Sequence, residues 1–142
     1  DNVELELGKS YVLREGSDVT IVACGVEIKE ALEAAELLSE MGISAEVIDA
    51  FSIKPFDKET LLSSVKKTGC VVVAEEHSIH GGLGSTVSEV LAQEYPCPCE
   101  FIGVKDRFGK SGEFDELLSY FELDAVSIVE AVKKATARKR IC

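Results

Sequence analysis

The stretch from Val71 to Ser85 contains the residue types most able to do chemistry. A short apolar run of β-branched residues ends in Glu75, Glu76 and His77, and a glycine-rich turn then opens an amphipathic segment. This order predicts a buried strand, a loop at its carboxyl end and a helix, and open α/β sheets tend to hold their ligands at the carboxyl ends of strands. Because the first amides of a helix attract negative charge, the loop is interpreted as a docking surface or an anion site.

Two catalytic interpretations of this loop compete with simpler ones. Glu75, Glu76 and His77 could form a tuned acid–base group, but solvated acids at a strand end are the interpretation we favour. Ser78 beside His77 could be a nucleophile with its base, but adjacent loop residues rarely face each other. No G-x-S-x-G elbow occurs in the sequence, which also argues against a serine hydrolase.

Glycines dominate the turn itself. Gly82 and Gly84 suit a left-handed backbone or a close approach by a neighbouring group, so we expect a side chain at Gly82 to cost stability. The partial match Gly82-x-Gly84 comes too late in the chain for a dinucleotide-binding fingerprint, and no P-loop sequence occurs.

The five cysteines, an odd number, argue against a disulfide framework. Cys24 and Cys70 lie in apolar strand patterns, which predicts buried thiols. Cys97 and Cys99 could begin a metal site with the two histidines, but tetrahedral zinc needs about four ligands at suitable spacing. We therefore interpret the Cys97–Cys99 segment as a structural loop.

The net charge of −11 excludes several partners. Nucleic acids and anionic membranes need a basic face, and no apolar run approaches the roughly 20 residues of a membrane span. The amino terminus lacks the basic and apolar regions of a signal peptide, so we expect a cytoplasmic protein.

Periodicity gives the elements that must position these residues. Strands are expected at 11–13, 19–23, 43–48, 70–74 and 99–104, and helices at 26–41, 57–68 and 83–95, followed by two closing helices. Acids of the first helix, Glu30 among them, are expected largely on its wet side. The alternation predicts an α/β fold of three layers, α/β/α, with a mostly parallel sheet.

Local signals should fix where these helices begin and end. Asp57 is expected to cap the second helix, and Gly42 and Gly69 to end the first and second. Asp124 or Ser127 is expected to cap the second of the two closing helices.

Four motifs occur in one order along the chain: G-x-D-V-T-I at 16–21, I-K-P at 53–55, E-E-H…G-G-L-G-S at 75–85 and D-x-F-x-x-S-G at 106–112. With them the chain resembles, over roughly Gly8 to Lys134, the C-terminal domain of transketolases, which deoxyxylulose phosphate synthases and 2-oxoacid dehydrogenase β subunits share. The resemblance implies a five-stranded sheet with one antiparallel edge strand. It also implies a linker at 1–9 from an upstream domain, the domain at 10–138 and a tail at 139–142.

The resemblance further implies a parent enzyme that uses thiamine diphosphate and magnesium. Such an enzyme moves a two-carbon ketol unit between sugar phosphates, as in the pentose phosphate pathway. Its metal motif, G-D-G…N-N, belongs to a first domain, and no G-D-G occurs here. The glutamate that activates the cofactor belongs to a middle domain. We therefore expect no catalytic, cofactor-binding or metal-binding residue in this chain, which should be inactive alone.

What remains are candidates for an anion site or a domain interface: Glu76, His77, Gly81, Gly82, Gly84, Ser85, Asp106, Arg107, Phe108, Ser111 and Gly112. The expected partners are the remaining transketolase domains or a partner subunit, within a homodimeric parent, and neither nucleic acid nor membrane. Two alternatives stay open. One is a stand-alone anion-binding, nucleotide-binding or dimerisation module, and the other is the matching domain of a 2-oxoacid dehydrogenase β subunit.

Overall fold

The computed structural model describes residues 8–25, 27–51, 55–76, 82–104 and 114–139, and for residues 76, 104 and 114–124 it describes the backbone alone. The strands are β1 (Tyr11–Arg14), β2 (Val19–Ala23), β3 (Ala45–Asp49), β4 (Val71–Glu76) and β5 (Cys99–Val104). The helices are α1 (Glu27–Glu40), α2 (Lys58–Thr68), α3 (Leu83–Glu94) and α4 (Phe114–Lys139).

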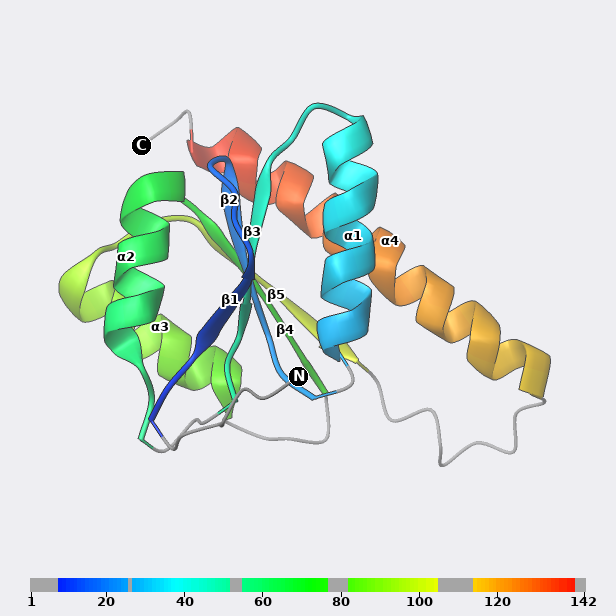
Figure 1. Ribbon diagram of the computed structural model, residues 1–142, viewed down its shortest axis with the longest axis horizontal. Helices are drawn as coiled ribbons and strands as arrows, with labels where there is room; N and C mark the ends of the chain where they lie inside the picture. The colour runs from blue at the N-terminus through cyan, green and yellow to red at the C-terminus, as the bar shows by residue number, and fades with distance from the viewer. Residues whose placement is uncertain (1–7, 26, 52–54, 77–81, 105–113, 140–142) are drawn as a thin grey trace.

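The strands form one sheet in the order β1-β3-β2-β4-β5. β1 pairs with β3 in the antiparallel direction, and all other neighbours are parallel. Figure 1 shows α2 and α3 on one side of the sheet and α1 and α4 on the other. The three-layer α/β/α fold with one antiparallel edge strand is therefore confirmed.

Each face of the sheet has its own core. Alternate residues of β2 point to opposite faces, so Ile21 packs with α1 and α4 whereas Val22 packs with α2 and α3. Every residue of β2 is buried, as expected for a strand covered on both faces. No helix in the described ranges is long and apolar enough to cross a bilayer.

The predicted ends of α1 and α2 are confirmed. Asp57 caps α2 by accepting a hydrogen bond from the Thr60 amide at 3.1 Å. Its other carboxylate oxygen accepts from the Ser10 amide at 3.0 Å, which ties the segment before β1 to the start of α2. Gly69 ends α2 in the left-handed conformation with φ of 85°, and Gly42 follows α1 with φ of 83°.

Two predictions about helices were wrong. The chain closes with the single helix α4, whose sequence no glycine or proline interrupts, so Asp124 and Ser127 lie inside a helix and not at the start of one. Glu30, expected on the wet side of α1, is only 3% exposed. It follows Glu27 by one turn and shares the stripe that buries Ala34, because residues three or four apart lie on one helix face.

Candidate functional site

The loop at the carboxyl end of β4 is closed by a side chain of the chain itself. Glu75, the last residue but one of strand β4, accepts hydrogen bonds from the amides of Leu83, at 3.2 Å, and Gly84, at 2.5 Å. These amides belong to the first turn of α3, where a helix carries partial positive charge and free N–H groups. The carboxylate of Glu75 thus occupies the place that an external anion would take. The interpretation of Glu75 as a solvated acid was wrong.

Gly84 is a glycine that a close approach requires. Neither Gly82 nor Gly84 has a left-handed backbone, since the described glycines with positive φ lie elsewhere and φ of Gly82 is −82°. A Cβ on Gly84 would lie 2.8 Å from Oε1 of Glu75 and 3.2 Å from Cδ1 of Phe101. A methyl group at this position would therefore press on the capping carboxylate and on an aromatic ring of β5.

A shallow hollow of about 490 Å³ opens beside this glycine. We call it the α3–β5 hollow, and its lining residues are Glu75, Gly84, Ser85, Ser88, Glu89 and Phe101. Sequence reasoning missed Phe101, because only the register of β5 against β4, which pairs Phe101 with Val73, places it on the α3 side of the sheet.

The remaining sequence candidates are placed unevenly. The structure brings Gly82, Gly84 and Ser85 together at the start of α3, and the backbone of Glu76 forms the end of β4. The other candidates, His77, Gly81, Asp106, Arg107, Phe108, Ser111 and Gly112, lie outside the described residues.

The surroundings of the described cysteines indicate a structural role. Cys70 is buried as predicted, whereas Cys24, also predicted to be buried, is half-buried, as are Cys97 and Cys99. Burial, with the neighbouring Cys97 and Glu100, raises the pKa of Cys99 to about 12, so this thiol is protonated at neutral pH. In the part of the chain that the structure describes, no three His, Cys, Asp or Glu residues gather closely enough to hold a metal ion.

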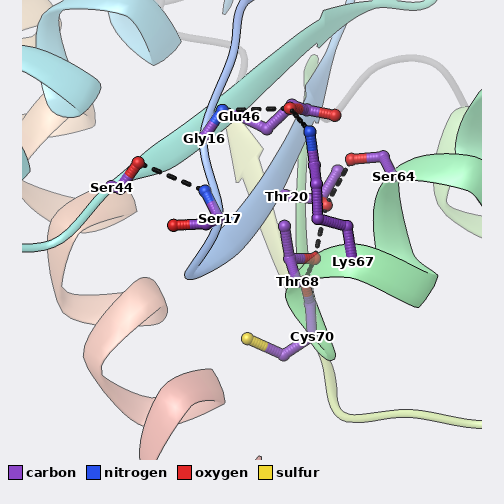
Figure 2. A network of polar contacts seen from close by, with 9 residues as sticks. All are labelled: Gly16, Ser17, Thr20, Ser44, Glu46, Ser64, Lys67, Thr68 and Cys70. Carbon is purple, nitrogen blue, oxygen red and sulfur yellow. Dashed lines mark hydrogen bonds and ion pairs between the residues drawn. The ribbon is translucent and has the colours of Figure 1, made fainter.

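A polar network that the sequence did not reveal lies at the opposite, amino end of the parallel strands (Figure 2). Glu46 of β3 accepts hydrogen bonds from the Gly16 amide at 2.9 Å and from Nζ of Lys67 at 2.5 Å. Burial acts to raise the pKa of Glu46, but these hydrogen bonds outweigh it and hold the pKa below its usual value. A carboxylate stays charged here although its side chain is 4% exposed.

Three hydroxyl groups extend this network across the face of the sheet. Oγ1 of Thr20 on β2 lies 2.6 Å from Oγ of Ser64 and 2.7 Å from Oγ1 of Thr68, both on α2. Thr68 in turn lies 3.2 Å from the Cys70 carbonyl. Each hydroxyl here is paired, as buried polar groups require, and the network joins α2 to the sheet rather than facing a ligand.

Fold and site together define a three-layer α/β domain whose helix N-terminus at the end of β4 is capped from within. A family model described as "Transketolase, C-terminal domain" matches residues 8–128. The chain belongs to this family.

Several curated proteins are similar to this chain over nearly its whole length. It is 49% identical over 98% of its length to the 6-deoxy-6-sulfo-D-fructose transketolase subunit SqwH of Clostridium sp. (strain MSTE9), of which it covers 43%. It is 44% identical over 93% of its length to a putative transketolase C-terminal section of Methanocaldococcus jannaschii, of which it covers 41%. It is 40% identical to 1-deoxy-D-xylulose-5-phosphate synthase 1 of Geobacter sulfurreducens, of which it covers 22%.

A solved structure described as "Split gene transketolase, inactive beta4 tetramer" is 49% identical, with a TM-score of 0.85. The match covers 97% of this chain and 44% of that one. The chain thus spans less than half the length of these relatives and corresponds to one part of a larger transketolase-type protein.

Proposed function

We propose that this chain is the structural and assembly domain of a thiamine-diphosphate-dependent transketolase that transfers two-carbon ketol units between sugar phosphates. The observation that carries the proposal is the 49% identity to a transketolase subunit over 98% of this chain but only 43% of the relative. The rest of such an enzyme supplies the chemistry, and this domain holds it in its assembled form. The fragment alone is inactive.

The described residues do not fit the cofactor. A diphosphate needs free amides or cations, and the amides of Leu83 and Gly84 at the start of α3 are already bound by Glu75. Glu75 and Glu89 would in addition repel a diphosphate from the α3–β5 hollow. No step of the reaction is therefore assigned to the described residues. Thiamine diphosphate and magnesium belong to other parts of the parent enzyme.

The partners in this proposal are the remaining transketolase domains, on the same polypeptide or on a separate subunit. The parent is a cytoplasmic homodimer acting in the pentose phosphate pathway. Residues 1–9 are the linker from its upstream part, residues 10–138 the domain and residues 139–142 a tail. The relatives described above are transketolase parts and a deoxyxylulose phosphate synthase, which favours this proposal over the 2-oxoacid dehydrogenase alternative.

A stand-alone anion-binding module is the alternative that the geometry supports least. Its binding group would be the N-terminus of α3, and Glu75 fills it.

A domain exchange tests the proposal. This chain replaces the matched part of the Clostridium subunit, and ketol transfer is measured for the chimaera with its partner and for the isolated chain. We expect an active chimaera and an inactive chain that shows no calorimetric binding of thiamine diphosphate with magnesium. Turnover by the isolated chain, or an assembled chimaera without activity, would contradict the proposal.

A further inference from the structure

We propose that the α3–β5 hollow docks an arginine or lysine side chain from the polypeptide that completes the enzyme. The inference rests on the proposed function for the identity of that polypeptide, but the surface itself is defined by contacts within this chain. Strand β5 ends the sheet, and no described strand pairs with its outer edge. Its six residues contain one charged side chain, Glu100. Apolar edge strands of this length are usually covered in a working protein, because an open edge invites pairing with other chains.

Phe101 is the exposed centre of this surface. Its ring packs beside Gly84, whose missing side chain leaves room for it, and yet the residue remains 52% exposed. The neighbouring Ile102 points to the other face of the sheet and packs against the core beneath α1 and α4. Phe101 is thus held in place by Gly84 on its own face of the sheet and by the packing of its neighbour Ile102 on the other face, while part of its surface stays open to solvent.

The groups around the ring select a cation. Glu75 and Glu89 contribute carboxylates, Ser85 and Ser88 contribute hydroxyl groups, and no basic residue lines the hollow. In the described part of the chain no hydrogen bond or ion pair holds the exposed Glu89. A guanidinium or ammonium group above the Phe101 ring would gain a cation–π contact and a carboxylate partner together.

Charge also decides which occupant fits. A second copy of this chain would bring an acidic surface toward Glu75 and Glu89, because the chain carries a net charge of −11. The relatives extend well beyond the part that this chain matches, so a transketolase-type enzyme contains further polypeptide able to cover the edge. We therefore commit to a basic residue of that polypeptide.

A peptide titration tests the site without requiring activity. The full chain, labelled with ¹⁵N, is titrated with acetyl-Gly-Arg-Gly-amide and with the matching citrulline peptide, which keeps the shape but lacks the charge. We expect saturable shifts of the amide signals of Ser85, Ser88, Glu89 and Phe101 with the arginine peptide alone. Phe101→Leu and Glu89→Gln should each weaken binding by about fivefold, the scale of one cation–π contact or ion pair.

Matched variants and a second measurement keep the result interpretable. Phe51→Leu changes another aromatic residue of similar exposure, 44%, and should leave the titration unchanged. Thermal melts confirm that each variant is folded. Equal binding of the citrulline peptide, shifts elsewhere on the surface, or binding unchanged in Phe101→Leu would overturn the proposal. If sedimentation showed that the chain self-associates and the same amide signals shifted with that association, the occupant would be a second copy and not a basic partner. An active chimaera without peptide binding would refute this site alone.

Discussion

At the scale of single residues, Glu75 decides what the loop after β4 can be. A carboxylate on the chain's own β4 satisfies two of the amides that would otherwise attract a phosphate. The same contact links the sheet to the first turn of α3, so one side chain both closes an anion site and positions a helix. Sequence could place Glu75 at the end of a strand, but its hydrogen bonds depend on where the chain returns after the loop, which no local pattern specifies.

Replacing Glu75 by glutamine tests this capping role. Glutamine keeps the size but loses the charge and one acceptor, so we expect a loss of about 1–2 kcal/mol in the free energy of unfolding. Urea denaturation of wild type and variant measures it. Glu89→Gln is the matched control, because Glu89 lines the same hollow but caps no amide, and it should change stability little. Equal effects of the two substitutions would contradict the capping role.

Gly84 gives a second test at this scale. Valine at position 84 would press on Glu75 and Phe101, and we expect a loss of about 1–3 kcal/mol, the usual scale of overpacking. The neighbouring Ser85 is exposed on the same helical turn, so Ser85→Val places the same β-branched side chain in the helix without the clash. Thermal melts of both variants give the comparison. A Gly84→Val protein as stable as Ser85→Val would show that the hollow can absorb the side chain.

At the scale of elements, the sequence predicted the features that depend on local residue types, namely the positions of the strands and the ends of two helices. Runs of β-branched residues located the strands, and Asp57, Gly42 and Gly69 located helix ends, because capping and left-handed turns need particular residue types. The prediction of two closing helices was wrong, because Asp124 and Ser127 can cap a helix but do not require one to begin there.

Contacts between elements escaped the sequence for a different reason. Phe101 and Glu46 have their roles because strands distant in the sequence are neighbours in the sheet, with a register that sequence periodicity cannot supply. The antiparallel edge strand was expected only from the family resemblance. The order of the strands was not predicted at all, because alternation predicts parallel pairing but not which strand lies beside which.

Glu46 gives a pH test at the scale of elements, because its carboxylate joins β3 to α2 and to the turn before β2. Its pKa is lower in the folded chain than the usual value of 4.5, so the folded state favours the charged form. The resulting stability is fully present above about pH 4.5 and is lost as the pH falls through the folded pKa. We expect Glu46→Gln to be less stable at neutral pH and to lose less stability on acidification than wild type.

Unfolding measured by urea at neutral and acidic pH checks this prediction. Glu36→Gln is the control, because the side chain of Glu36 is 70% exposed in its pair with Arg14 and exposed pairs contribute little. If the free energy of unfolding of Glu46→Gln fell with pH as much as that of the wild type, the network would not be what lowers the pKa of Glu46.

At the scale of the whole molecule, two opposing features govern association. The sheet is open at both edges in the described part of the chain, and the antiparallel edge strand β1 exposes Val12 at 44% and Leu13 at 45%. A bulge between Val12 and Arg14 interrupts the regular pairing of β1, which makes it a poorer template for another strand. The net charge of −11 adds a repulsion between copies that acts at a distance.

Weak self-association that increases with salt is the result expected from these features. Raising the salt from about 0.1 M to about 1 M shortens the range of charge repulsion from roughly 10 Å to roughly 3 Å, while the apolar contact of Leu13 remains. Sedimentation velocity over a concentration series at both salts measures the shift. Leu13→Thr keeps a strand-forming residue but removes apolar surface, and should reduce the association. Leu37→Thr changes a leucine of 37% exposure that lies on α1 and not on β1, and it should leave the association unchanged. Association that weakens with salt would show that charge, and not the β1 edge, brings the copies together. A reduction by Leu37→Thr as large as that by Leu13→Thr would show that α1 takes part instead.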